Sequence, residues 1–411
     1  MTTSQTTSNY LSRRAGGAFL AATLILVCLS CYASAVDSKS RQKTPPPVQI
    51  DINKLVWPPP PDVPRIKWVR LALGEGDVTG SVSKKKKSSW MDKMAGVSLP
   101  SERGKPRLAK PYGIAFDSKG RIFVADPPQG GVFVFDLENK KVEYRGVQQL
   151  RAPMGLAMDD TDRLFVSDSE QHVIFCFKAD GGLEGTFGAD KLFKPIGIAL
   201  DRDNRYLYVA DAGSNRIAVF DADNFKLLRS FGGKSDATMA PGTFDRPTNV
   251  AVDDDGNVYI TDTFNDRVQV FDADGQFVRM WGKTGNTAGS FMRPKGIAVD
   301  SDKHVYVVDS EFNNVQMFDS EGHTLMFFGG RGDTPGAFTL ASGIGFDERT
   351  HRVVVSEQWL GRVQVFRYTT DAEAKPEYEK LAKEEEERRA KQEAADKAES
   401  DKSIAATNSA K

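Results

Sequence analysis

A motif of seven residues recurs six times along this 411-residue chain, and it constrains the fold more than any other feature. Five copies open with Pro and the last with Ala; Gly or Asn follows two residues later, then three small or apolar residues, and an Asp ends the motif. The copies start at Pro111, Pro153, Pro195, Pro247, Pro294 and Ala341. Their spacing of about 42 to 52 residues is that of a repeated unit of several short strands. The chain is therefore expected to contain six similar units.

Each unit predicts four short strands, and residues 247–282 show the pattern most clearly. The first strand ends at Asp253, in a turn where a carboxylate can bond the backbone and a Gly can adopt positive φ. A second strand is predicted at 258–262, and a third at 267–272 alternates apolar and polar residues as a half-buried strand does. A fourth ends at Trp281. Six such units predict an all-β fold, a six-bladed β-propeller.

The last repeat lacks a fourth strand, because the sequence after Phe366 becomes a Lys/Glu/Ala tract. Residues 65–74 (RIKWVRLALG) resemble the fourth-strand run at 277–282 (FVRMWG). We expect this N-terminal segment to pair with the edge of the last blade and to close the ring, which removes an exposed strand edge. The prolines at 58–61 are expected to stiffen the approach as polyproline II.

These repeats resemble NHL repeats, whose signature is P-x-G-I-A-V-D, then V-Y-V-A-D, then N-x-R-V-Q-V-F. The resemblance covers roughly residues 108–366 and is strongest in the fourth and fifth copies, whereas His172, Asn249 and Glu357 depart from the signature. The N-terminal layout is similar to that of exported bacterial six-bladed propeller proteins of unassigned function. The resemblance implies a fold and a compartment but hardly any chemistry.

The N-terminus has the composition of an export signal, because Arg13 and Arg14 precede an apolar stretch at 15–29. Two processing routes fit the sequence: cleavage after the small residues at 33–35, or lipidation of Cys31. A retained membrane anchor is a third. We expect the protein in the periplasm or cell envelope, either free or attached to the membrane through its N-terminus.

A basic insert separates the predicted closing strand from the first repeat. It contains four lysines at 84–87, followed by Trp90 and Met94 on one face of a short predicted helix. One interpretation is a helix packed across the propeller. The other is a contact with an anionic membrane surface or a partner.

The chain is divided here as follows: a signal peptide or lipoprotein signal at 1–35, a Pro-rich linker at 36–64, a ring-closing strand at 65–74, a basic insert with a short helix at 75–107, the NHL propeller at 108–368, and a charged helical or disordered tail at 369–411.

The charge balance gives no sign of a polyanion partner. Lys and Arg number 55 against 56 for Asp and Glu, so the formal net charge is -1. Together with the export signal, this disfavours a nucleic-acid partner. Of the 3 cysteines, Cys176 alone lies in the repeat region, in an apolar strand pattern typical of a buried thiol.

Two sets of charged residues recur at fixed repeat positions. Acids end the second strand of each unit, at Asp126, Asp168, Asp211, Asp262, Asp309 and Glu357, and arginines begin three third strands, at Arg216, Arg267 and Arg362. Because these positions gather around the channel of a propeller, they predict a binding site for an anionic ligand or a cation. The ligand-binding candidates are Asp211, Arg216, Asp262, Arg267, Asp309, Arg362, Arg246 and Arg293. The alternative is an Asp/Arg lattice that fixes loops and blades.

No catalytic residue is predicted, because common hydrolase and nucleotide-binding motifs are absent. His304, His323 and His351 are expected on the face opposite the acids and His172 on the same face, away from the inner strands, so no metal ligands are assigned. No cofactor is predicted, although the acids are compatible with a bound divalent cation.

The sequence favours a binding or scaffold role over a catalytic one. Three long Gly-rich loops, 232–246, 282–293 and 329–340, are expected on one face, where a rigid scaffold usually presents its binding surface. The expected partner is a protein or a small molecule. The alternative is a metal-assisted lyase or lactonase with its site at the channel mouth, and a third hypothesis is an envelope structural protein whose charged tail engages another subunit.

Overall fold

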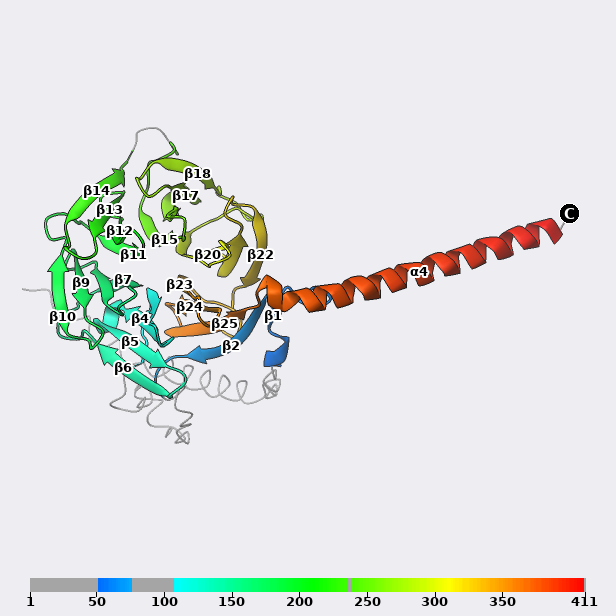
Figure 1. The fold of residues 1–411 in the computed structure, drawn as a ribbon, viewed down its shortest axis with the longest axis horizontal. Helices are drawn as coiled ribbons and strands as arrows, with labels where there is room; N and C mark the ends of the chain where they lie inside the picture. The colour runs from blue at the N-terminus through cyan, green and yellow to red at the C-terminus, as the bar shows by residue number, and fades with distance from the viewer. Residues whose placement is uncertain (1–50, 76–106, 235–238, 410–411) are drawn as a thin grey trace, which may run out of the picture. The chain divides into compact units, whose positions relative to one another are not determined.

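The computed structural model describes residues 51–75, 107–234 and 239–409. The export signal, Cys31 and the helix predicted in the basic insert lie outside these residues. Within them, six sheets form a six-bladed propeller, as predicted (Figure 1). No helix of the described part is long and apolar enough to cross a membrane.

Five blades are four-stranded antiparallel sheets in which each strand pairs with the next along the chain. Blade one contains β3 (Ile114–Phe116), β4 (Ile122–Asp126), β5 (Gly131–Asp136) and β6 (Lys141–Arg145), with the 3-10 helix η2 (Pro127–Gln129). Blade two contains β7 (Pro153–Met158), β8 (Leu164–Asp168), β9 (Val173–Phe177) and β10 (Leu183–Phe187). Blade three contains β11 (Pro195–Asp201), β12 (Tyr206–Asp211), β13 (Arg216–Asp221) and β14 (Leu227–Gly232). Blade four contains β15 (Pro247–Val252), β16 (Val258–Asp262), β17 (Arg267–Phe271) and β18 (Phe277–Trp281), with η3 (Thr263–Asn265). Blade five contains β19 (Pro294–Val299), β20 (Val305–Asp309), β21 (Asn314–Phe318) and β22 (Thr324–Gly329).

The core consists of layers between neighbouring blades. In β16, Val258 and Ile260 pack with side chains of blade three, whereas Tyr259 packs with side chains of blade five. Successive residues of a strand point to opposite faces, so a strand with a blade on each side buries both sets. For this reason β16 and β17 are buried throughout, while the outer strand β18 is half exposed.

Blade six combines the two ends of the described chain. It contains β23 (Ala341–Asp347), β24 (Arg352–Glu357) and β25 (Arg362–Tyr368), and β2 (Ile66–Ala72) pairs antiparallel with β25. The predicted closure by the N-terminal segment is confirmed. Trp68 fixes this pairing further, because its indole Nε1 donates a hydrogen bond to Gln364 Oε1 at 2.8 Å.

The prolines at 58–61, expected to stiffen the approach to the closing strand as polyproline II, directly follow a short strand that the sequence analysis did not predict. β1 (Val56–Trp57), preceded by the 3-10 helix η1 (Ile52–Lys54), pairs with β2 and gives blade six a fifth strand. The Trp57 ring lies 6.1 Å from the Phe328 ring and 5.9 Å from the Phe366 ring. Burial of this aromatic side chain accounts for a strand that the sequence pattern did not reveal.

Helix α4 (Asp371–Ser409) follows the last strand of the propeller. Its first turn is tied to blade six by two ion pairs: Arg65 with Asp371, and Arg367 with Glu373 at 2.6 Å. Ala374 is buried. The tail predicted as helical or disordered is thus a helix over these residues.

Candidate functional site

The strand order gives the propeller two different ends. The loop face carries the connections from second to third strands and from each fourth strand to the next blade. The turn face carries the tight turns between first and second strands and between third and fourth strands, such as 253–256 and 272–275. The predicted ligand-binding residues all belong to the loop face.

The six repeat acids of the loop face are fully buried and bound to the backbone. Asp168 accepts hydrogen bonds from the amides of Arg151 at 2.7 Å and Ala152 at 3.1 Å, and Asp309 accepts one from the amide of Met292 at 2.7 Å. The same bond recurs for Asp126 with Ala109 and Lys110, Asp211 with Phe193 and Lys194, Asp262 with Asp245, and Glu357 with Thr339. Each acid therefore holds the segment that leads into the first strand of its own blade.

Two of the predicted arginines also form hydrogen bonds with other groups of the protein. The Arg267 guanidinium donates to Asp262 Oδ2 at 2.8 Å and to the carbonyl oxygens of Met239 at 2.7 Å and Thr243 at 2.8 Å. Arg362 repeats the arrangement, with Glu357 Oε1 at 2.6 Å and the carbonyl oxygens of Asp333 and Ala337. Their donors hold the long loops in place, as the lattice interpretation expects.

Burial raises the pKa of Asp262, although hydrogen bonds from Asn265, Asp245 and Arg267 oppose the shift. Arg216 is placed more loosely: its Nε lies 3.5 Å from Asp211 Oδ2, and its side chain is 31% exposed. Of the predicted residues, Arg246 and Arg293 have exposed side chains on the loop face.

The central channel contains a cavity of about 470 Å³. Its walls are first-strand residues of the blades, and it extends from the turn face to the level of Gly113, Gly155 and Asn249. Tyr112 closes it toward the loop face, because this buried side chain packs with Ile196 and hydrogen-bonds Thr248 of blade four. Burial raises the pKa of Tyr112. The cavity is therefore separated from the predicted binding loops.

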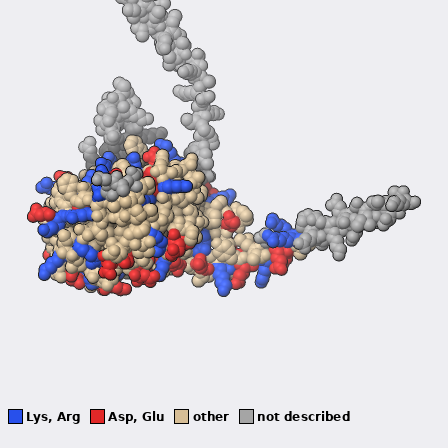
Figure 2. Space-filling model, turned by 90° about the horizontal axis from the view of Figure 1, so that it is seen from above, with Lys and Arg blue, Asp and Glu red and all other residues tan. Residues whose placement is uncertain are grey.

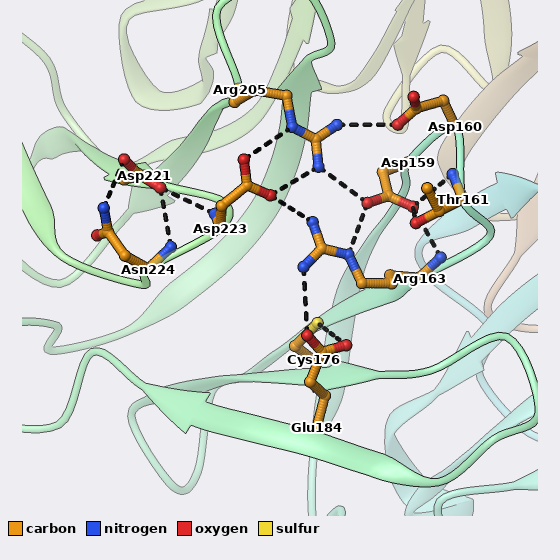
Figure 3. A network of polar contacts seen from close by, with 10 residues as sticks. All are labelled: Asp159, Asp160, Thr161, Arg163, Cys176, Glu184, Arg205, Asp221, Asp223 and Asn224. Carbon is orange, nitrogen blue, oxygen red and sulfur yellow. Dashed lines mark hydrogen bonds and ion pairs between the residues drawn. The ribbon is translucent and has the colours of Figure 1, made fainter.

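The rim of the cavity on the turn face is rich in carboxylates that are paired with arginines. In Figure 3, Arg163 and Arg205 converge on Asp159, with Arg163 Nε at 2.7 Å and Arg205 Nη2 at 3.0 Å from Oδ2, and both also bind Asp223. Burial alone would raise the pKa of Asp159, but hydrogen bonds from Arg163 and its neighbours outweigh it and lower the pKa to about 2. This network ties blade two to blade three.

Cys176 borders the same network, with its Sγ 4.0 Å from Glu184 Oε2 (Figure 3). It is buried and unpaired with another cysteine of the described chain. Burial raises the pKa of the thiol to about 12, so the reactive thiolate is scarce at neutral pH.

In the part of the chain that the structure describes, no group of three His, Cys, Asp or Glu side chains is arranged to hold a metal ion. His304 and His323 lie on the turn face, and their Nδ1 atoms lie 3.0 Å from Asp300 and 2.9 Å from Asp319. His351 lies directly before the corresponding strand of blade six, β24. His172 stacks on Phe193 at the loop face, with 6.0 Å between the ring centroids.

Sequence reasoning missed the large apolar side chains that the loop face exposes to solvent. Phe193 is 65% exposed, Phe264 51% and Trp359 75%. Met239, Met292 and Leu340, on other connections of the loop face, are also exposed. A signal existed, because Phe264 and Trp359 occupy a repeat position at which other blades carry Glu170, Gly213 or Glu311.

Cations without carboxylate partners lie beside these apolar groups. Lys194, Arg246, Arg293 and Lys295 form no ion pair with a carboxylate of the described residues. The Arg246 guanidinium instead lies over the Phe264 ring, 4.7 Å from its centroid. On the side of the propeller that Figure 2 shows, both acidic and basic side chains lie at the surface.

Comparison with known proteins places the chain among six-bladed propellers. Residues 243–357 match the family described as a 6-bladed beta-propeller, and residues 186–284 match the SMP-30/Gluconolactonase/LRE-like region. A probable peptidyl-alpha-hydroxyglycine alpha-amidating lyase of Caenorhabditis elegans is 35% identical over 81 residues, which span only 18% of this chain and 22% of that protein.

Two solved structures illustrate the likeness of fold. An auxiliary nutrient binding protein from Bacteroides thetaiotaomicron has a TM-score of 0.52 at 12% identity, over 64% of this chain and 69% of that one. A gluconolactonase from Xanthomonas campestris has a TM-score of 0.50 at 18% identity, over 64% of this chain and 86% of that one. At these identities the likeness extends to the fold, and binding proteins and enzymes share it. The chain is a six-bladed β-propeller.

Proposed function

We propose that the chain is a non-catalytic binding or scaffold propeller of NHL type, which acts outside the cytoplasm and engages a protein or small ligand through its loop face. The observation that carries this proposal is the exposure of Phe193, Phe264 and Trp359 on that face. Exposed aromatic side chains beside arginines are characteristic of interaction surfaces.

Two loops of the same face, next to the connections that carry these aromatic side chains, are held in place by buried arginines. Arg267 binds carbonyl oxygens of the loop that leads into blade four, and Arg362 does the same for the loop that leads into blade six. A surface fixed before binding loses less conformational entropy when a ligand binds. Export is proposed from the N-terminal sequence, with Cys31 as the lipidation candidate.

The test uses two paired variants and capture of partners from the envelope fraction of the native host, quantified by cross-linking and mass spectrometry. F264S with W359S removes two aromatic side chains of the loop face. L325S with F327S removes equally exposed apolar side chains on the outer strand β22. We expect the first pair to lose the captured partner and the second to retain it, with both folded by circular dichroism. Equal capture by wild type and both variants would overturn the proposal.

A second candidate is a metal-assisted lyase or lactonase. It is favoured by the match of residues 186–284 to the lactonase-like region and by the local likeness to an amidating lyase. Metal content of protein purified without chelator, combined with thermal unfolding in EDTA, separates the two. One tightly held ion per chain, whose removal lowers the melting temperature, would favour the enzyme. No ion and no shift would favour the binding protein.

A further inference from the structure

Cations at two repeat positions, one on each face of the propeller, differ in their pairing. On the turn face, Arg121, Arg163 and Arg352 are paired with Asp117, Asp159 and Asp347 at 2.6, 2.7 and 3.0 Å. On the loop face, the residue directly before the first position of the repeat motif is basic in four blades. We call these residues the basic ring: Lys110, Lys194, Arg246 and Arg293. All four are exposed, and none pairs with a carboxylate of the described residues.

Of the acids near the basic ring, the repeat acids are already used, whereas Asp266 lies close enough to Arg293 for their charges to interact. The repeat acids at the ends of the second strands lie directly beneath it, but their oxygens are buried and accept backbone amides. For example, Asp211 Oδ1 accepts the amide of Lys194 at 2.7 Å, which fixes the backbone of that lysine while its ammonium remains unpaired. The fold therefore positions these cations and leaves their charge available.

Arg246 shows how firmly one of these positions is fixed. Its φ of 52° lies in the left-handed region, which is costly for a residue with a Cβ, and its amide donates to Asn215 Oδ1 at 2.7 Å. Its guanidinium rests on Phe264. Stacking on an aromatic face leaves the in-plane N–H groups of an arginine free to bind a carboxylate.

Lys295 lies further toward the channel, and it too has an anchored backbone and an ammonium group without an ion pair among the described residues. Its carbonyl oxygen accepts a hydrogen bond from Thr261 Oγ1 at 2.7 Å, so its backbone is anchored. Burial, together with the charge of Arg293, lowers the pKa of its ammonium group, although the charge of Glu311 opposes the shift. An anionic group at this position would offset both effects.

Exposed carboxylates interrupt the surface at Glu170 and Glu311, on the connections between second and third strands. Asp190 and Asp333 are also exposed, on connections from a fourth strand to the next blade. They would repel a continuous phosphate backbone or an anionic membrane, which presents charge everywhere. A protein segment can place its carboxylates opposite the cations and its apolar side chains on the aromatic rings. Aromatic side chains and arginines are also enriched at protein interfaces.

Building on the proposed function, we infer that the partner of the loop face is an acidic protein segment, with carboxylates that bind the basic ring and apolar side chains that pack on Phe193, Phe264 and Trp359.

The test selects random dodecapeptides displayed on phage against the folded chain. We expect the selected peptides to be enriched in Asp and Glu together with aromatic or large aliphatic residues. R246M with R293M removes two charges but keeps most of each apolar stem, and it should weaken binding of a selected peptide about tenfold or more. The control R367M removes an exposed, ion-paired arginine of blade six and should leave the affinity unchanged.

Several outcomes would overturn the inference: no acidic enrichment, no selected peptide, equal affinity of R246M with R293M, or complete competition by phosphatidylglycerol vesicles or single-stranded DNA. The proposed function fails separately. If F264S with W359S loses the native partner while R246M with R293M retains it, the binding face stands and the acidic partner is wrong. If both retain it, both ideas fail.

Discussion

At the scale of single residues, one repeat position serves different purposes according to its burial. The pattern of an Asp followed by an Arg is compatible with a ligand clamp and, more simply, with a structural lattice, because both need the same charges at the same spacing. The structure buries Asp262 and Arg267 beneath the loop that leads into blade four, and their hydrogen bonds go to the protein. Sequence alone could not show this, because the covering loop is contributed by residues about 25 positions away.

Arg267 and Arg216 occupy the same repeat position, and they provide a matched pair for measuring how burial changes the contribution of an arginine to stability. We expect R267A to lower the free energy of unfolding by about 3–5 kcal/mol, because it leaves Asp262 buried and uncompensated. R216A should cost at most about 1 kcal/mol, because this side chain is 31% exposed and lies 3.5 Å from its acid. Urea unfolding of both variants measures the two losses. If R267A lowered the free energy of unfolding as little as R216A does, Arg267 would not be an essential part of the lattice.

At the scale of elements, the closing strand is the feature on which the ring depends. Its sequence predicted β2 because a fourth-strand pattern was missing from the last repeat and present near the N-terminus. β1 could not be predicted in this way, since two residues show no periodicity and prolines follow directly. The exposure of Phe264 and Trp359 could not be predicted either, because residues in loops follow no periodic pattern that indicates whether they are buried.

Two positions of β2 test how much this strand contributes to stability. Ile66 is fully buried against blade six, whereas Val69 is 45% exposed. We expect I66A to lower the free energy of unfolding by about 2–5 kcal/mol through lost burial and a residual cavity. V69A should change it by no more than about 0.5 kcal/mol. Denaturant unfolding with both variants is the measurement, and a negligible effect of I66A would mean that the closing strand contributes little to stability.

At the scale of the whole propeller, stability is shared around the ring, because each core layer belongs to two blades. Ala72 of β2 and Val363 of β25 pack in one cluster with Phe133 of blade one. The contact between the first and last blades, called here a seam, is therefore a core layer like those between the other blades. Glycines of the first strands allow this close approach: a Cβ on Gly343 would lie 1.9 Å from the carbonyl oxygen of Tyr112. A substitution that disturbs one seam should therefore lower the stability of all the blades of the ring.

G343A tests this coupling. The added methyl group meets backbone and cannot be accommodated without moving blade one from blade six, so we expect a loss of about 1–3 kcal/mol. G182A is the control, because the nearest atom to its new Cβ is the mobile carboxylate of Asp180 at 3.1 Å. In native-state hydrogen exchange, G343A should reduce protection in blades three and four as much as at the seam, since the layers unfold together. Reduced protection confined to blades six and one would show instead that the blades unfold independently and that closure stabilises only the seam it forms.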